Sequence, residues 1–166
     1  MQMDFTNNLD KAMEYLHKQG AFLTVKNGDK TNTMTISWGN IGYEWNRPIF
    51  MALIRTSRYS YDFIKESKEF TISIPTNDKL KKALSICGTK SGRDINKFKE
   101  ANIKTKDSKK LSAPIIDDCG IYYECKVVYS SDIDLSKIDK DIKDKIYSDG
   151  RFHTLFFGEI VESYEK

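Results

Sequence analysis

AFLTVKNGDKTNTMTISW, residues 21–38, consists of two β-rich runs on either side of the dipeptide Asn27-Gly28. Asn-Gly between two such runs is typical of a two-residue hairpin turn, because both residues readily adopt positive φ angles. In the second run apolar residues alternate with hydroxyl-bearing ones up to Trp38, which places the two kinds on opposite faces of a strand. The stretch therefore predicts an antiparallel hairpin.

Outside this hairpin, four more β-rich runs are predicted to be strands: 49–54, 70–75, 122–129 and 152–164. Helices are predicted from the helical spacing of apolar residues or from capping residues. They are expected over 9–19, 93–101 and 138–146, and also directly after two capping positions, Ser60 and either Asn77 or Asp78. The helix over 138–146 is amphipathic, with a charged outer face. The Gly-rich segment 39–48 is predicted to be a loop. The helices are inserted at irregular positions and do not give the regular strand–helix alternation of a doubly wound sheet. This pattern favours an antiparallel barrel decorated with helices.

Length and composition indicate a single globular domain, residues 1–166, with 39% apolar and 31% charged residues. The net charge of +3 is too small to favour nucleic acid or an anionic membrane. Three cysteines and two histidines show no metal-ligand spacing, so we expect no metal site. The N-terminal residues have no basic start followed by an apolar stretch, so a cytoplasmic protein with reduced thiols is expected.

Two segments carry the residue types that a ligand site needs. RTSRYSYDF (55–63) places two arginines and two serines at a predicted helix start, where free N–H groups and the helix dipole favour an anion. NTMTISWG (32–39) offers hydroxyls along one strand face and Trp38 as an apolar wall for a flat ligand. The alternative interpretation is structural: a solvated turn with Ser60 as an ordinary helix cap, and a solvent-facing row of hydroxyls.

Two further features are less specific. CGTKSGRDINKF (87–98) turns sharply before a helix and offers Lys90, Ser91 and Arg93 to an anion, but it matches neither the Walker loop nor the G-x-G-x-x-G motif. His153 begins the last predicted strand. With no second histidine nearby in the sequence it predicts no nucleophilic triad, and it is either structural or a site residue.

Taken together, the order and spacing of these segments resemble the flavin reductase-like family of FMN-binding split barrels, nearest to its flavoredoxin-type subgroup. The resemblance extends from GAFLTVK to FHTLFFGEIVESY and includes RPIFMALIRTSRYSYDFI, FTISIP and YYECKVVY. It implies a mainly β fold with inserted helices, a six-stranded antiparallel Greek-key split β-barrel. It also implies a homodimer that holds FMN non-covalently near the subunit interface.

The resemblance also implies roles for individual residues. The strand 33–38 would lie along the isoalloxazine, 55–61 would hold the phosphate and ribityl chain, and 90–92 would close over the flavin. Lys90 would be the positive group near the reduced ring, and His153 would be the catalytic residue near the nicotinamide or flavin face. The implied cofactor-binding residues are Thr33, Met34, Thr35, Ser37, Trp38, Arg55, Ser57, Arg58, Tyr59, Ser60, Tyr61, Lys90, Ser91 and Gly92.

Three functions remain open at this level. The first is an FMN-dependent oxidoreductase that takes electrons from NADH or NADPH and passes them to free flavin or another acceptor. The second is a flavoredoxin-type carrier that holds FMN tightly and exchanges electrons with a redox partner protein, without its own NAD(P)H turnover. The third is a small barrel that stacks nucleic-acid bases on its exposed aromatic residues, which the missing basic stripe disfavours.

Overall fold

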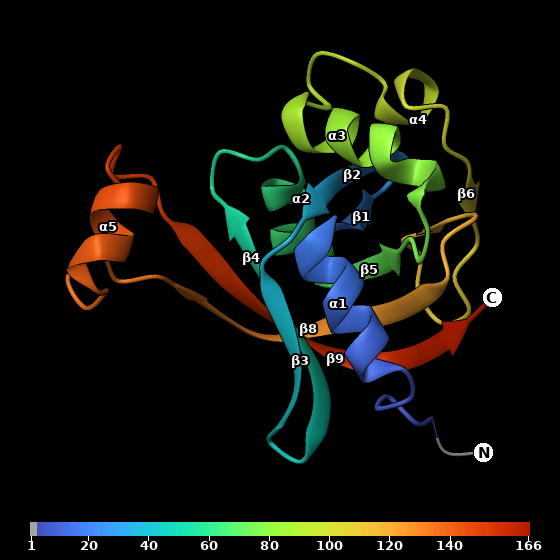
Figure 1. The fold of residues 1–166 in the computed structure, drawn as a ribbon, viewed down its shortest axis with the longest axis horizontal. Helices are drawn as coiled ribbons and strands as arrows, with labels where there is room; N and C mark the ends of the chain where they lie inside the picture. The colour runs from blue at the N-terminus through green and yellow to red at the C-terminus, as the bar shows by residue number, and fades with distance from the viewer. Residues whose placement is uncertain (1–2) are drawn as a thin grey trace.

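The computed structural model describes residues 3–166, and a strongly bent antiparallel sheet dominates it (Figure 1). The sheet has seven strands in the order β2-β1-β5-β8-β9-β4-β3. Their bounds are β1 Ala21–Asn27, β2 Lys30–Ile36, β3 Gly39–Glu44, β4 Arg47–Arg55, β5 Glu69–Ile74, β8 Ile121–Asp132 and β9 His153–Glu165. A separate two-stranded ribbon pairs β6 Thr105–Lys106 with β7 Ile115–Ile116. The expectation of a mainly β, antiparallel chain is confirmed, but the count of six strands is wrong.

The additional strand is β3, in the segment predicted to be a loop. It pairs with β4 in register from Gly39↔Ala52 to Glu44↔Arg47. The turn between them is Trp45-Asn46, whose φ angles of 52° and 60° are those of a tight hairpin turn. The prediction failed because Trp-Asn lacks the usual hairpin signature and because two glycines in β3 resemble loop composition. By contrast, the hairpin around Asn27-Gly28 is confirmed, with Asn27 opposite Lys30.

The sheet bends around one main core, and its two end regions contribute side chains to that core. Met34 and Ile36 of β2 belong to the same buried cluster as Phe50 and Ala52 of β4, although no hydrogen-bonded ladder joins these strands in the described residues. Closure of the sheet therefore depends on side-chain packing and not on a continuous barrel ladder. A second buried cluster covers the opposite face of β1, around Phe22.

Helices cover both faces of the sheet. Their bounds are α1 Leu9–Lys18, α2 Ser60–Ser67, the 3-10 turn Asp78–Leu80, α3 Lys81–Thr89, α4 Lys97–Glu100 and α5 Lys140–Ile146. Asn77 accepts from the Lys79 backbone N–H at 3.0 Å and so begins the 3-10 turn as predicted. The Ser60 cap is wrong, because Ser60 lies inside α2 and its hydroxyl accepts from Asn32 Nδ2 at 2.8 Å. The helix predicted over 93–101 is shorter, since only Lys97–Glu100 is helical.

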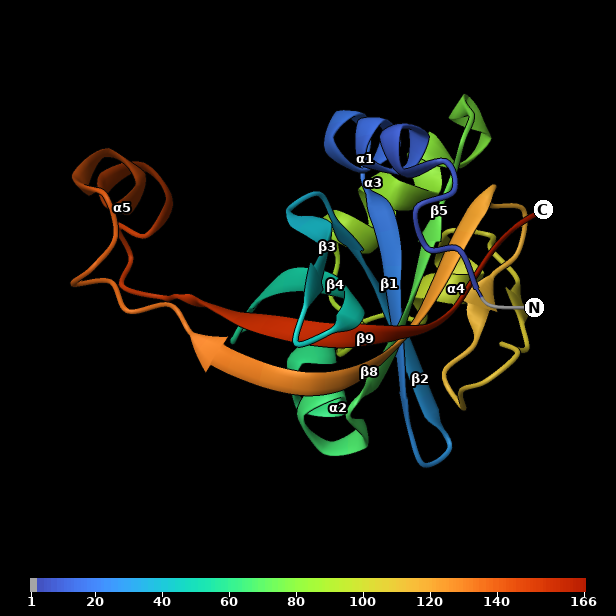
Figure 2. The same cartoon turned by 90° about the horizontal axis from the view of Figure 1, so that it is seen from below.

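An arm formed by residues 133–152 projects from the body at the ends of β8 and β9, and it carries α5 (Figures 1 and 2). No residue of α5 is buried, and Ile142 is 46% exposed. The sequence predicted an amphipathic helix with one solvated face, but the apolar face is also uncovered. In residues 3–166 no helix combines the length and apolarity needed to cross a membrane.

Candidate functional site

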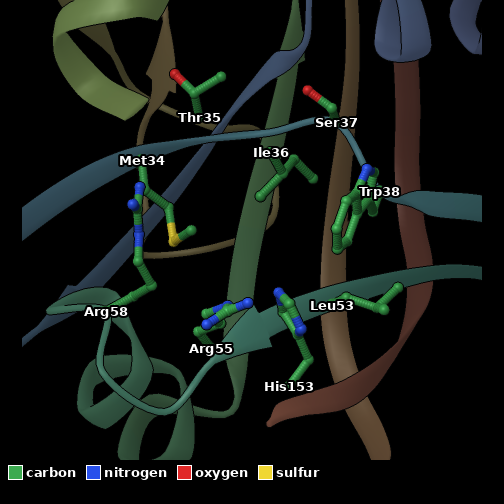
Figure 3. Close-up of a pocket in the computed structure, with 9 residues that line it drawn as sticks. All are labelled: Met34, Thr35, Ile36, Ser37, Trp38, Leu53, Arg55, Arg58 and His153. Atoms are coloured by element: carbon green, nitrogen blue, oxygen red, sulfur yellow. The ribbon is translucent and has the colours of Figure 1, made fainter. Parts of the chain in front are cut away.

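A surface cavity of about 360 Å³ lies where the end of β2 faces the end of β4 and the start of β9 (Figure 3). Strand register brings distant segments together here, because Arg55 of β4 is directly opposite His153 of β9. Arg58 and Trp38 lie on opposite sides of the opening (Figure 3). The lining residues of this first cavity are Met34, Thr35, Ile36, Ser37, Trp38, Leu53, Arg55, Arg58 and His153.

Two cations meet at the C-terminal end of α3, beside this cavity. Arg58 donates through Nη1 to the Gly88 carbonyl at 2.9 Å and through Nη2 to the Cys87 carbonyl at 3.5 Å. Lys97 donates through Nζ to the carbonyls of Cys87 and Thr33, both at 2.9 Å. Carbonyl groups at a helix C-terminus carry partial negative charge, which favours cations there.

Lys97 is a buried lysine, only 3% exposed. Within the described part of the chain, neither Lys97 nor Arg58 forms an ion pair with a carboxylate. Burial and the nearby charge of Arg58 lower the pKa of Lys97 to about 8, while Cys87 opposes the shift. Buried cations are normally paired, so this pair provides positive charge that an anionic ligand would neutralise.

A second cavity of about 370 Å³ lies beyond the two cations, between β2, the start of α2 and the segment before α4. Gly92 comes so close to Asn32 here that a Cβ atom on it would lie 2.2 Å from Asn32 Oδ1, so a larger residue does not fit. Arg93 stacks over the Tyr59 ring at 5.1 Å. The lining residues of the second cavity are Lys30, Thr31, Asn32, Tyr59, Phe63, Gly92, Arg93, Asp94, Ile95, Asn96, Lys97 and Phe98.

His153 stands at the other end of the first cavity. Its Nδ1 is hydrogen-bonded to the Tyr147 hydroxyl at 2.9 Å, and its ring centroid lies 5.4 Å from that of Trp38. Burial, together with the charges of Arg55 and Arg58, lowers the pKa of His153 to about 4. The imidazole is therefore neutral at pH 7.

The structure gathers only part of the predicted residue set at the first cavity. Seven predicted residues line it: Met34, Thr35, Ser37, Trp38, Arg55, Arg58 and His153. Two predicted residues line the second cavity: Tyr59 and Gly92. Six predicted residues line neither cavity: Thr33, Ser57, Ser60, Tyr61, Lys90 and Ser91.

The hydroxyl face of β2 is not exposed to solvent, contrary to one of the two interpretations. Thr33 is fully buried, and its hydroxyl lies 3.0 Å from that of Thr24 and donates to the Leu23 carbonyl at 3.2 Å. The Thr35 hydroxyl donates to the Leu84 carbonyl at 2.6 Å. Both hydroxyls are already hydrogen-bonded within the protein, that of Thr33 to β1 and that of Thr35 to α3.

Other predicted residues face elsewhere for identifiable reasons. The Lys90 ammonium forms an exposed ion pair with Glu100 at 3.0 Å. The Tyr61 hydroxyl is hydrogen-bonded to the Thr154 hydroxyl at 3.2 Å, outside both cavities. Arg55 does line the first cavity, but its guanidinium also donates to the Ile146 carbonyl of the arm at 2.6 Å.

The cavity residues that were not among the predicted site residues include Ile36 and Leu53 in the first cavity and Asn32 and Lys97 in the second. Lys97 has the largest chemical significance of these. It lies in the segment 87–98 that was singled out, but a lysine beside Phe98 looks like an ordinary exposed helix residue. Only the packing of α4 against β2 shows that Lys97 is buried.

Residues 13–166 match the family model described as flavin reductase like domain. The chain belongs to this family. An uncharacterized protein of Archaeoglobus fulgidus is 32% identical over 149 residues, which cover 90% of this chain and 73% of the relative.

Solved structures share the flavin reductase-like fold at lower identity. Flavoredoxin of Desulfovibrio vulgaris (Miyazaki F) aligns with a TM-score of 0.70 and 22% identity, over 89% of this chain and 69% of that one. Nitrilotriacetate monooxygenase component B from Bacillus cereus aligns with a TM-score of 0.71 and 16% identity, over 99% of this chain and 77% of that one. At these identities the likeness establishes the shared fold.

Proposed function

We propose that this flavin reductase-like protein binds FMN non-covalently and passes electrons from NADH or NADPH through it to free flavin or another acceptor. One observation carries the proposal: the first cavity has Arg58 at one end and Trp38 with His153 at the other, and the buried Lys97, which lines the second cavity, shares the Cys87 carbonyl with Arg58. FMN has the same polarity, with an anionic phosphate at one end and a flat aromatic ring at the other. The cavity volume of about 360 Å³ lies in the range of small-molecule sites.

At the phosphate end, Arg58 and Lys97 would bind the anion. Arg58 supplies a planar guanidinium suited to a phosphate, and Lys97 supplies a compact ammonium. Among residues 3–166 neither has a carboxylate partner to abandon, and Lys97 is buried while Arg58 is half-buried. Binding would therefore replace contacts with neutral carbonyls by contacts with a full negative charge.

At the ring end, the strand residues Met34 and Ile36 and the opposing Leu53 would form an apolar slot, with Trp38 at its edge. Trp38 is 48% exposed, so its indole is accessible to a ligand. When bound, FMN would supply the hydride and electron transfer, while the protein sets its orientation and the charge around its ring. His153 would be the residue nearest the reacting face, and it is a neutral hydrogen-bonding group at pH 7.

An absorbance spectrum of the purified protein with FMN, before and after anaerobic addition of NADPH or NADH, tests this function. We expect flavin bands that bleach promptly with one of the nucleotides. Bands that persist until dithionite or a partner reductase is added would contradict NAD(P)H turnover and favour the flavoredoxin-type carrier. A protein that stays colourless after incubation with FMN would overturn flavin binding altogether.

A second copy of the chain is the proposed partner, through an exposed aromatic patch formed by Trp45, Val128, Tyr129 and Phe157. Trp45 packs edge to face against Tyr129 and Phe157 with ring centroids 5.7 Å apart, and the Tyr129 and Phe157 rings are tilted at 5.5 Å. Trp45 is nevertheless 58% exposed and Tyr129 49% exposed, and a groove of about 610 Å³ lies beside them. Clustered exposed aromatics are characteristic of interaction sites, and homodimers bury such apolar surfaces.

Cysteine chemistry supports a reducing compartment for this function. Cys87, Cys119 and Cys125 are all buried and free. Burial raises the pKa of Cys87 to about 11, so this thiol is unreactive at pH 7 despite its nearness to Lys97. We therefore propose a cytoplasmic protein in which the cysteines have a packing role.

A further inference from the structure

The Tyr147 side chain makes a buried contact with the only histidine of the first cavity. Tyr147 is 4% exposed and His153 is 8% exposed, and the distance from the Tyr147 hydroxyl to His153 Nδ1 is 2.9 Å. The two rings meet edge to face with centroids 5.5 Å apart. In the described residues, this is the only hydrogen-bond partner of the Tyr147 hydroxyl.

Which of the two groups donates in this hydrogen bond follows from which groups would otherwise lack a hydrogen-bond partner. Burial raises the pKa of Tyr147, so the hydroxyl keeps its proton at pH 7. If that proton is donated to Nδ1, the hydroxyl and Nδ1 are both satisfied. If instead Nδ1 carried a proton and donated it, the hydroxyl proton would have no acceptor among residues 3–166. Leaving a buried donor without an acceptor is unfavourable, so the first arrangement is the stable one.

A neutral imidazole that accepts at Nδ1 must carry its proton at Nε2. His153 lines the first cavity, and its ring lies between Arg55 and Leu53 (Figure 3). No protein group in the described part of the chain is hydrogen-bonded to Nε2, which leaves that N–H available to a ligand.

We propose that Tyr147 is a positioning residue, whose hydroxyl holds His153 as the Nε2–H tautomer so that the ring offers a hydrogen-bond donor to the ligand in the first cavity. The ligand atom that meets this donor would be an acceptor, such as a carbonyl oxygen of a heteroaromatic ring. This last point rests on the proposed function, whereas the tautomer itself does not.

The arm supplies Tyr147, and its base is fixed to the site by Arg55. Tyr147 directly follows α5, and the preceding residue, Ile146, accepts through its carbonyl from Arg55 Nη2 at 2.6 Å. Arg55 also pairs with Asp149 at 3.4 Å. Because Arg55 lies opposite His153 in the β4–β9 ladder, the same residue positions the arm and flanks the imidazole. The arm thus takes part in the site through one hydroxyl group.

Nitrogen NMR of protein labelled with 15N-histidine tests the proposal without any ligand. The chain has only two histidines, and the exposed His17 serves as an internal reference. At pH 7 we expect His153 to show an unprotonated Nδ1 and a protonated Nε2. In Tyr147→Phe, which keeps the ring and removes only the hydroxyl, we expect both His153 signals to shift toward a mixture of tautomers.

A second measurement connects the tautomer to electron transfer. We expect Tyr147→Phe to slow the reduction of bound FMN by NAD(P)H about two- to tenfold, the effect of one lost hydrogen bond, with less change in FMN affinity. Tyr43→Phe, on an exposed tyrosine that lines neither cavity, is the matched control and should change neither quantity. A wild-type His153 protonated at Nδ1, or His153 signals unchanged in Tyr147→Phe, would overturn the proposal. FMN that NAD(P)H does not reduce, in a protein with the Nε2–H tautomer, would contradict the proposed function and leave the tautomer assignment supported.

Discussion

Arg58 and Lys97 donate to the same acceptor, the carbonyl oxygen of Cys87, at 3.5 Å and 2.9 Å. The two cations come from segments 39 positions apart in the sequence, and they converge on the last turn of α3. Like charges that share one acceptor in a buried region repel each other, and this repulsion helps to lower the pKa of Lys97. A bound anion would relieve that repulsion, which makes the pair the most direct target for mutation.

We expect Arg58→Ala to weaken FMN binding by about 1.5–3 kcal/mol, the range for a hydrogen bond to a charged group. Riboflavin has no phosphate, so its affinity should change little. Titrations of both ligands, followed by flavin fluorescence, measure the difference. Arg47→Ala removes an exposed arginine that pairs with Glu159 and should leave both affinities unchanged. Equal losses for FMN and riboflavin in Arg58→Ala would show that Arg58 does not bind the phosphate.

Lys97 makes the phosphate preference dependent on pH. Its pKa in the free protein is about 8, so the ammonium loses its proton as the pH rises through that value. We expect the affinity of wild-type protein for FMN, relative to riboflavin, to fall several-fold between about pH 7 and pH 9.5. In Lys97→Met, which keeps an unbranched chain of similar length, the preference should be smaller and independent of pH over this range. The same pH dependence in Lys97→Met would exclude Lys97 as its source.

Trp38 is half-exposed, so we expect its replacement to change the properties of the bound ligand and to leave the stability of the protein nearly unchanged. We expect Trp38→Ala to change the free energy of unfolding by less than about 1 kcal/mol, as is usual for a surface substitution. The absorbance bands and the redox potential of bound FMN should shift, while the preference for FMN over riboflavin persists. A spectrum and potential identical to those of the wild type would place the ring away from Trp38.

The low pKa of His153 predicts that the protein loses stability as the pH falls. Its pKa is about 4 in the folded protein, below the ordinary value of 6.5, so the unfolded chain takes up a proton first as the pH falls. The free energy of unfolding therefore decreases between pH 6.5 and about 4, by at most about 1.4 kcal/mol per pH unit from this one group. Urea unfolding at pH 7 and pH 5 measures the slope, and His153→Gln should show a smaller slope. Identical slopes would mean that His153 titrates normally.

The aromatic patch predicts the oligomeric state. We expect light scattering during size-exclusion chromatography to give a dimer for the wild type and a monomer for Trp45→Asn. Asn suits position 45, because φ is 52° there and Asn tolerates positive φ better than most residues. Trp38→Ala, a change to the other exposed tryptophan, should remain dimeric. A wild-type monomer at all concentrations would contradict this interface.

Local pattern was sufficient for the parts of the fold that depend on near neighbours. Asn27-Gly28 between alternating runs predicted the β1–β2 hairpin, and apolar residues at helical spacing predicted α1. The order of the motifs was sufficient to indicate the family. Two of the segments singled out in the sequence contribute Trp38 and Arg58 to the lining of the first cavity.

Tertiary structure decided which side of each element is covered. Thr33 and Thr35 carry the hydroxyls of a typical exposed face, yet Thr33 is buried against β1 and Thr35 is bonded to α3. Lys97 looks like a surface lysine, yet α4 packs it against β2. Conversely, the apolar residues of α5 predict a buried face, but the arm extends away from the core. Local sequence sets the period of a helix or strand, but burial depends on contacts between segments far apart in the chain. The pairing of β4 with β9 and the bending of the sheet create those contacts, and with them the site.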